Sequence, residues 1–333
     1  MKRNYQAYRM SQPSRAGALE TLNWDELGTG EVIIESQYSS VNYKDALAIT
    51  NRGKILRRLP MVPGIDVAGT VVSCKGGALQ AGDQVLVTGC GIGENQDGGY
   101  AEFISVPESS VVPLPKGLSL QEAMILGTAG FTAALALYRL EQNGQTPQKG
   151  PIVITGASGG VGSIATDLLS AQGYEVWAIS SKPESQNFLS ELGARKIMAP
   201  AQLELGSRPL ESVRFAGAID NVGGSMLSGL LRHVELWGNV ASVGLAAGAE
   251  FEGNVMPFIL RGVSLLGISS NNCVLALRHE LWRRLAGLWK PKHLAQIHSR
   301  TISLHELPKV CEEILDRKST GRILVDLKKG LKS

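Results

Sequence analysis

The stretch that decides the fold reads Ile152-Val153-Ile154-Thr155-Gly156-Ala157-Ser158-Gly159-Gly160-Val161-Gly162-Ser163. Its first four residues form a short apolar run, which predicts a buried strand, and the small residues after it predict a tight turn. Helical spacing follows over residues 160–172, and a second apolar run at 175–179 closes the unit. Because two parallel strands need a crossover helix between them, this order of elements predicts a parallel sheet.

The small residues between this strand and this helix suit a phosphate ligand. Without bulky side chains the backbone can approach a pyrophosphate, and the start of the helix offers unbonded N–H groups and the positive end of its dipole. The loop approximates the G-x-G-x-x-G pattern, with Ala157 where the first glycine often stands. Its place between a strand and a helix favours a dinucleotide site over the alternative, a tight turn without a ligand.

Four more apolar runs complete a predicted six-stranded sheet of the doubly wound α/β class, at residues 196–198, 215–220, 239–243 and 264–268. Upstream, residues 30–112 read as an irregular β module broken by glycine and proline, with strands expected at 31–34, 68–72, 84–87 and 100–106. Helices are expected from residue 120, over 128–140, over 275–288 and over 305–316. A closing strand at 321–327 has no place among the six, so we expect it to return to the first module.

The composition excludes several classes of protein. The chain has 333 residues, of which 44% are hydrophobic and 19% charged, enough to bury a sizeable core in two domains. A net charge of only +3, with scattered basic residues, argues against a nucleic-acid partner. The apolar stretch 123–138 is interrupted by glycine and falls short of a membrane span. The N-terminus lacks a secretory signal, and the four cysteines form no C-x-x-C pair, so we expect a cytoplasmic protein with reduced thiols.

The cofactor choice is expected to depend on the residues after the second strand. An NAD site usually has an acidic residue about 20 residues beyond the glycine loop, whereas this strand ends in Ser180-Ser181-Lys182. With no carboxylate to repel a 2′-phosphate and a lysine and two hydroxyls to bind it, NADP is favoured. The alternative is that Lys182 is an ordinary solvated loop charge.

Four further motifs combine with the glycine loop into a family resemblance: NYKDALAIT (42–50), PGIDVAGTV (63–71), GTAGFTA (127–133) and MPFILR (256–261). Together they resemble zinc-free medium-chain dehydrogenases/reductases, and more narrowly the quinone-oxidoreductase-like branch that includes NADPH-dependent acryloyl-CoA reductase. The resemblance covers nearly the whole chain from about residue 30. It implies a GroES-like catalytic domain over 1–124 and 290–333, a Rossmann domain over 125–289, and a homodimer.

The resemblance also implies that no metal is bound. Zinc-dependent relatives hold the catalytic metal with a cysteine, a His-Glu pair and a later cysteine or acid, whereas the matching stretches here offer Asn42 and Gly64-Ile65-Asp66. None of the five histidines falls in the early module. Without a Lewis acid, hydride transfer to an unactivated ketone is difficult, so conjugate reduction is the expected reaction. The implied activity is the NADPH-dependent reduction of an enoyl-CoA C=C bond, with acryloyl-CoA giving propionyl-CoA.

Two alternatives to this activity stay open. A quinone or alkenal reductase would use the same hydride chemistry without CoA, and an NADPH-binding regulatory protein would bind the cofactor without turnover.

The family pattern assigns roles to residues of this chain. Ser158, Gly159, Gly160 and Val161 are expected at the pyrophosphate, Ser180, Ser181 and Lys182 at the 2′-phosphate, and Leu245, Ile259 and Ser270 beside the nicotinamide, although core packing is the alternative for the apolar ones. Tyr43 is expected at the nicotinamide, where it orients the ring or supplies the proton, or else packs as an ordinary aromatic. Asn42 and Asp45 are expected to shape the same catalytic site, and Asp45 fits equally well a role in capping local backbone.

Two departures from the pattern bear on the ligands. Relatives tend to carry an arginine for the adenosine phosphate where this chain has Ala199-Pro200, and they often have His-Trp where it has Gln96-Asp97, a difference that bears on acryloyl specificity if this loop borders the acyl site. For CoA, a basic cluster at Lys54, Arg57 and Arg58 is a candidate phosphate contact, with a solvated basic turn as the alternative.

Overall fold

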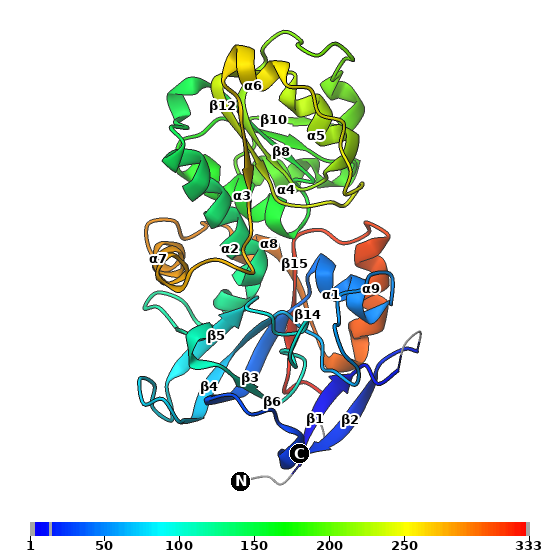
Figure 1. Cartoon of the computed structure of the whole chain (residues 1–333), viewed down its shortest axis with the longest axis vertical. Coiled ribbons are helices and arrows are strands. Elements are labelled where there is room, and N and C mark those ends of the chain that lie inside the picture. The colour runs from blue at the N-terminus through cyan, green and yellow to red at the C-terminus, as the bar shows by residue number, and fades with distance from the viewer. Residues whose placement is uncertain (1–3, 13–14, 331–333) are drawn as a thin grey trace. The chain divides into compact units, whose positions relative to one another are not determined.

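A six-stranded parallel sheet forms the centre of one part of the protein (Figure 1). The computed structural model describes residues 4–12 and 15–330. Neighbouring strands of this sheet are all parallel, in the order β10 (Lys196–Met198), β9 (Val176–Ile179), β8 (Ile152–Thr155), β11 (Phe215–Asp220), β12 (Val234–Ser242) and β13 (Ser264–Gly267). The predicted doubly wound α/β class is confirmed, with all six predicted strands in it.

The sheet changes its direction of growth at β8, since β9 and β10 lie on one side of it and β11 to β13 on the other. All four residues of β8 are buried, which explains the continuous apolar run in the sequence. The carboxyl ends of β8 and β11 are therefore adjacent at the topological switch point, where α/β sheets bind ligands. The helices of this part include α3 (Gly160–Ala171), α4 (Gln186–Glu191), α5 (Gly224–Leu231), α6 (Met256–Arg261) and α8 (Leu294–Ile297), together with most of the long helix over residues 120–142.

A second, mixed sheet contains both early and late segments of the chain. Its strands run in the order β14 (His298–Ile302), β15 (Arg322–Asp326), β3 (Val32–Ser40), β4 (Asp66–Cys74), β5 (Gln84–Thr88) and β7 (Val112–Pro113), with β6 (Phe103–Val106) paired to β3. The closing strand β15 pairs antiparallel with β3. Its predicted return to the first module is thus confirmed, and β14, which the sequence did not predict, pairs parallel with it.

Three short elements near the N-terminus escaped prediction. The strands β1 (Asn4–Arg9) and β2 (Ala18–Asn23) form a hairpin, and α1 (Tyr43–Ile49) is a seven-residue helix. Helix α1 packs against α9 (Leu307–Leu315) (Figure 1). A helix of two turns has little periodicity to detect, because its stability comes from this packing and from its cap. The expected strand at 100–106 was too long, since β6 begins only at Phe103.

Helix α2 (Leu120–Gln142) covers both helices predicted from residue 120 and over 128–140, and it is broken between them at Gly127, where φ is 50° and ψ is −154°. Its length and composition would allow a membrane span, yet 83% of its most apolar window is buried inside the protein. A core helix of a soluble protein has the same properties. The kink at Gly127 follows from a left-handed backbone conformation that glycine adopts readily.

The chain forms two compact units. Unit 1 comprises Met1–Thr128, Asn271–Ala286 and His298–Ser333, and unit 2 comprises Ala129–Ser270 and Gly287–Ile297. This division assigns helix α7 (Leu275–Ala286) to unit 1, where the prediction had the Rossmann domain, and it assigns residues 290–297, with α8, to unit 2, where the prediction had the catalytic domain. Each unit has its own core, because the β3 to β6 region and the parallel sheet bury separate apolar clusters.

Candidate functional site

The glycine loop of unit 2 lies at the carboxyl end of β8. Gly156 has φ of +58° and turns the chain away from the strand. A Cβ on Gly162 would lie 2.3 Å from the Gly156 carbonyl oxygen and 2.6 Å from the Cα of Ala157, so only glycine lets α3 pack this closely. A Cβ on Gly159, the N-cap of α3, would meet only the Gly156 oxygen at 3.3 Å. Gly162 therefore serves packing, whereas Gly159 leaves open space at the helix start.

The neighbouring strand end carries a buried acceptor that fits a hydroxylated ligand. The Asn221 N–H donates to Thr155 Oγ1 at 2.9 Å, and its side-chain Nδ2 donates to the Thr155 carbonyl at 2.8 Å. Within residues 4–12 and 15–330, nothing donates to its buried Oδ1 atom. A ligand with a hydroxyl donor, such as a ribose, would satisfy this oxygen at the switch point of the sheet. The residues present therefore fit a dinucleotide.

The Asp220 carboxylate holds the carboxyl ends of β8 and β11 together. Its Oδ1 accepts from Thr155 Oγ1 at 2.6 Å, and its Oδ2 accepts from the Gly223 N–H at 2.9 Å. Burial raises the pKa of this carboxyl above its ordinary value. From the sequence, Asp220 was assigned no role beyond the end of a predicted strand, and this link, which joins the ends of β8 and β11, was missed.

Of the residues expected at the 2′-phosphate, Ser180 belongs to a hydroxyl cluster after β9. Ser180 Oγ lies 3.0 Å from Ser158 Oγ, and Ser185 Oγ lies 2.9 Å from Ser180 Oγ. The structure thus joins the predicted pyrophosphate and 2′-phosphate segments, with Ser185 as a member that the sequence reading missed. Ser181 is exposed, and Lys182 is half-buried. Partial burial lowers the pKa of Lys182 below its usual range, so the lysine is not a fully solvated loop charge.

The residues expected beside the nicotinamide lie on three segments of unit 2. Leu245 follows β12 and is 55% exposed, Ile259 is on α6 and 72% exposed, and Ser270 follows β13. The exposure of both apolar side chains in this chain excludes the alternative that they serve the core. Gly160 and Val161 form the first turn of α3, as the phosphate hypothesis requires.

In unit 1, the three predicted catalytic residues stand at the start of α1. Asn42 is the N-cap, Tyr43 is the first helical residue, and Asp45 completes a capping box. Asp45 Oδ2 accepts from the Asn42 N–H at 2.9 Å and from Asn42 Nδ2 at 3.0 Å, while its Oδ1 accepts from the Ile65 N–H at 3.0 Å. The capping role left open for Asp45 is confirmed. Tyr43 is 39% exposed.

Burial, and then the charge of Asp66, raises the pKa of Asp45 to about 7. The Asp45 side chain is 1% exposed and its oxygens accept from backbone and from Asn42, so its contacts are internal to the protein. Of the three predicted catalytic residues, Tyr43 is the one with a substantially exposed side chain.

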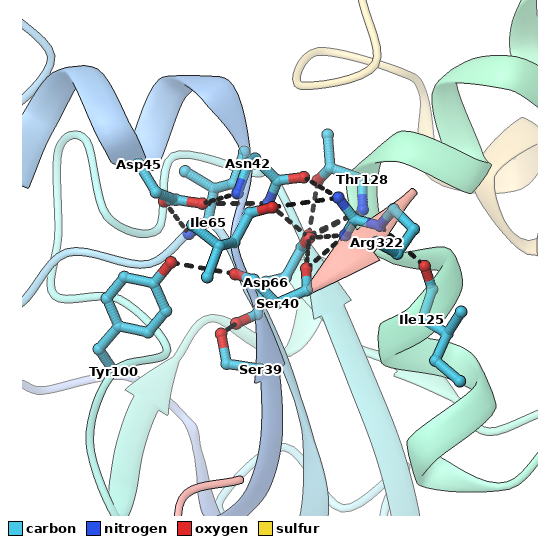
Figure 2. Close-up of polar contacts among 11 residues, drawn as sticks. Ser39, Ser40, Asn42, Asp45, Ile65, Asp66, Tyr100, Ile125, Thr128 and Arg322 are labelled. Carbon is cyan, nitrogen blue, oxygen red and sulfur yellow. Dashed lines mark hydrogen bonds and ion pairs between the residues drawn. The ribbon is translucent and has the colours of Figure 1, made fainter. Parts of the chain in front are cut away.

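A buried ionic network surrounds the Asn42 side chain, and sequence reasoning missed it as a functional feature. We call Ser40, Asn42, Asp66, Thr128 and Arg322 the Asp66–Arg322 network. Figure 2 shows them converging from β3, the start of α1, β4, α2 and β15. Asn42 Nδ2 donates to Asp66 Oδ2 at 2.8 Å, and Asn42 Oδ1 accepts from Arg322 Nη1 at 3.2 Å. The sequence offered one signal for Arg322: a charged residue stands near the start of the predicted closing strand, 321–327.

The basic cluster considered for CoA is solvated. Lys54, Arg57 and Arg58 are exposed, and Arg58 Nη2 lies 3.4 Å from Asp97 Oδ2. Asp97, which stands where relatives often have tryptophan, also accepts from the Val62 N–H at 2.9 Å through Oδ1. Exposed ion pairs of this kind contribute little to stability. The geometry favours the solvated-turn alternative over a formed phosphate site.

No group of three or more His, Cys, Asp or Glu side chains that could hold a metal ion occurs in the described part of the chain. The four cysteines are free thiols, of which Cys311 is buried.

Comparison with known families matches both parts of the chain. The sequence profile of the alcohol dehydrogenase GroES-like domain matches residues 28–116, and that of the zinc-binding dehydrogenase family matches residues 160–287. These two matches coincide with the β module and with the parallel-sheet region.

Individual relatives match over nearly the full length. Acrylyl-CoA reductase AcuI of Ruegeria pomeroyi is 45% identical over 93% of this chain and 94% of its own. YhfP of Bacillus subtilis, named as a quinone oxidoreductase, is 44% identical over 93% of this chain and 94% of its own, and its structure with NAD bound superposes with a TM-score of 0.93. The structure of the YhdH oxidoreductase of Salmonella enterica in complex with NADP covers 97% of this chain and 99% of that one, at 43% identity and a TM-score of 0.93.

Proposed function

Because the chain belongs to the quinone-oxidoreductase-like branch of the medium-chain dehydrogenase/reductase family, we propose that this oxidoreductase reduces the C=C bond of acryloyl-CoA with NADPH, giving propionyl-CoA. The observation that carries the proposal is the 45% identity to an acrylyl-CoA reductase over 93% of the chain. The glycine loop, the small residue Gly162 behind it and the unsatisfied Asn221 oxygen at the sheet's switch point support the cofactor.

The chain's own residues would then have separate roles. The first turn of α3 binds the pyrophosphate, and Ser181 and Lys182 bind the 2′-phosphate. NADPH, when bound, supplies the hydride for the β-carbon of the substrate. Tyr43 supplies the proton for the α-carbon or orients the reacting groups, since Asn42 and Asp45 use their polar atoms within the capping box and the Asp66–Arg322 network. Catalysis would rest on alignment and fixed hydrogen-bond donors.

The test is the rate of NADPH oxidation across a panel of acryloyl-CoA, longer enoyl-CoA thioesters and small quinones. We expect acryloyl-CoA to give the highest kcat/KM, and Tyr43→Phe to lower kcat at least tenfold, because the phenol hydroxyl supplies the proton or orients the reacting groups. Cofactor binding without turnover on any activated alkene would support the regulatory alternative and contradict the proposal.

A quinone or alkenal reductase is the second candidate. It is favoured by the 44% identity to YhfP and by the pairing of Arg58 with Asp97, which leaves the basic cluster without a formed site for CoA phosphates. If this candidate is correct, a quinone is turned over faster than any CoA thioester, and Arg57→Ala together with Arg58→Ala leaves every KM unchanged.

We further infer that the reaction needs no zinc and that the enzyme is cytoplasmic. The described residues offer no set of three metal ligands, and Asn42, at the position of a zinc-ligating cysteine in relatives, uses its amide within the protein. We expect full activity after EDTA treatment and dialysis. Stoichiometric zinc in the purified active enzyme would overturn this inference.

A homodimer through unit 2 is also proposed. β13 is an edge strand of the parallel sheet, and near it Trp237 and Leu260 are 71% and 56% exposed. Exposed apolar surface beside an open sheet edge is typical of a subunit interface. Light scattering should give twice the mass of one chain, and Trp237→Asp should reduce it to a monomer. Leu288→Asp, at a side chain that is 81% exposed on another segment, is the matched control.

A further inference from the structure

Arg322 is a buried cation whose guanidinium is directed at one short segment. It is 3% exposed at the first position of β15. Nη2 donates to Ser40 Oγ at 2.7 Å, and Nη1 donates to the Val41 carbonyl and to Asn42 Oδ1, both at 3.2 Å. The fork of one arginine thus binds three consecutive residues, and Tyr43 is the next residue along the chain; Figure 2 shows the guanidinium beside Ser40 and Asn42. Nε donates to the Ile125 carbonyl at 2.8 Å, so both edges of the guanidinium are engaged.

Asp66 is the buried anion of the same network. It is fully buried, and its Oδ2 lies 3.9 Å from Arg322 Nη2. Ser40 Oγ bridges the pair, since it accepts from Arg322 and donates to Asp66 Oδ2 at 2.6 Å. Thr128 donates to Asp66 Oδ1 with its hydroxyl at 2.6 Å and to Oδ2 with its N–H at 2.9 Å. Asp66 thus contacts Ser40, Thr128 and Arg322 at the same time.

The Asn42 amide links this network to α1. Its Oδ1 accepts from Arg322, and its Nδ2 donates to both Asp66 and Asp45. An N-cap residue sets where a helix begins and in which direction its first residue projects. Arg322 and Asp66 therefore fix the orientation of Asn42, and Asn42 in turn fixes where Tyr43 lies at the start of α1.

The network is also packed tightly from the side of α2. A Cβ on Gly127 would lie 2.5 Å from Asp66 Oδ2, 2.8 Å from Ser40 Oγ and 2.9 Å from Arg322 Nη2. No side chain larger than that of glycine fits at this position without moving the charged groups, so the arrangement has little freedom to shift.

Stability alone does not account for such a network. Removing a guanidinium and a carboxylate from water is costly, and well-packed apolar residues of similar volume usually stabilise a core as well or better. What an arginine adds is a planar fork that fixes several partners at once. Here the partners are the three residues before Tyr43. The buried charges therefore fix the orientation of Tyr43.

We propose that Arg322 is a positioning residue of the reductase, which acts through Asn42 to fix the start of α1 and thereby the placement of Tyr43. The proposal rests on the role assigned to Tyr43 in the proposed function. Arg322 touches no reacting atom in this scheme, so its effect is expected on kcat. The KM for NADPH should change less than twofold, because the glycine loop belongs to unit 2.

The first experiment combines Arg322→Lys with Tyr43→Phe. Lysine keeps the charge but lacks the fork, so it cannot hold Ser40, Val41 and Asn42 together. We expect Arg322→Lys to lower kcat at least tenfold, and Tyr43→Phe to lower kcat less than twofold further in that background, although it costs at least tenfold in the wild type. Independent, multiplying effects of the two substitutions would overturn the proposal.

Arg278→Met provides the matched control in the same unit. Arg278 is 1% exposed, and its Nη1 donates to the Thr88 carbonyl at 2.6 Å, so it is a comparably buried arginine that binds another segment. Tyr43→Phe should keep its full effect in this background. If the control abolished the Tyr43 effect as Arg322→Lys does, the coupling would reflect general loss of structure and the proposal would fail.

Asn42→Ser tests the same link without changing Arg322, so it remains informative if the arginine variants misfold. Serine can still cap α1 but is too short to reach Arg322, so this variant should reproduce the loss of coupling with the ion pair intact. Retained coupling in the Asn42→Ser variant would overturn the transmission through Asn42.

A spectroscopic measurement separates this proposal from the proposed function. In protein labelled with ¹³Cζ-tyrosine, the Tyr43 resonance, assigned by its loss in Tyr43→Phe, should shift or broaden in Arg322→Lys and remain unchanged in Arg278→Met. This readout needs no substrate, so it still decides the positioning role if neither acryloyl-CoA nor a quinone is reduced. An unchanged Tyr43 resonance in Arg322→Lys would contradict the proposal.

Discussion

Lys182 illustrates how far a single residue can be interpreted from the sequence and what its surroundings add. The sequence places it after β9 at the position where cofactor choice is read, and the structure shows a half-buried amine whose pKa is lowered by burial. Glu184 lies nearby and raises the pKa in part. The strand end itself, Ser180-Ser181-Lys182, carries no carboxylate, as the sequence analysis stated.

Replacing Lys182 with alanine should weaken the binding of NADPH about tenfold, which corresponds to ~1.4 kcal/mol, because a charge-assisted contact to the 2′-phosphate is lost. The Kd for NADH should change less than twofold. Fluorescence titration of both cofactors measures the ratio, and Lys149→Ala, at a lysine that donates to the Trp237 carbonyl, is the control. Equal weakening of both cofactors would contradict the assignment of Lys182 to the phosphate.

Asp45 makes the stability of the protein depend on pH. Its pKa is about 7 in the folded chain, against an ordinary value of 3.8. Between about pH 4 and pH 7 the folded state therefore holds a proton that the unfolded state has released, so this group's contribution to the free energy of unfolding falls as the pH rises. Urea unfolding at pH 5 and pH 7.5 should show a larger loss for the wild type than for Asp45→Asn. The same pH dependence in both proteins would contradict the raised pKa.

At the scale of elements, the β8, glycine loop and α3 unit was predicted closely. The predicted strand 152–155 is present without change, and the predicted helix 160–172 ends one residue earlier, at Ala171. Local patterns decide such a unit, because an apolar run, small residues and helical spacing follow one another without interruption. The shorter α1 was not predicted: its capping box of Asn42 and Asp45 is local, but seven residues give little periodicity, and the partners that hold the Asn42 side chain, Asp66 and Arg322, lie far away in the chain.

The two glycines of this unit should respond differently to alanine. Gly162→Ala forces a Cβ against the Gly156 oxygen at 2.3 Å, which we expect to destabilise the protein by about 2 kcal/mol through overpacking. Gly159→Ala meets only an atom at 3.3 Å, so the free energy of unfolding should change by less than about 1 kcal/mol, whereas the affinity for NADPH should fall at least tenfold because the pyrophosphate needs that space. Calorimetry and cofactor titration measure the two effects. A Gly159→Ala protein with unchanged affinity would contradict the placement of the pyrophosphate.

At the scale of the whole molecule, unit 1 is discontinuous in sequence. β15 lies between β14 and β3, and it carries Arg322 into the network with Asp66. A segment near the end of the chain is therefore required by a sheet whose other strands come mainly from the first third. The sequence predicted this return only because β15 had no place among the six parallel strands.

Ending the chain after Ser319 should therefore abolish the fold of unit 1, because β14 and β3 lose the strand between them and Asp66 loses its counter-ion. Ending it after Lys328, beyond β15 and the buried Leu327, should leave the melting temperature within a few degrees of the wild type. Soluble yield and circular dichroism melts compare the two. A cooperative melt at the wild-type temperature for the shorter chain would contradict the role of β15.

The sequence by itself determined the parallel sheet, the glycine loop and the family, because each depends on residues that are close together in the chain and on spacings that a strand or helix imposes. It also placed Tyr43, Asn42 and Asp45 in one motif. Only the tertiary structure decided which of them is exposed, because Asn42 and Asp45 are engaged by partners brought from distant segments: Ile65, Asp66 and Arg322. Burial of those charges makes their hydrogen bonds obligatory, and no local pattern encodes which partner will satisfy them.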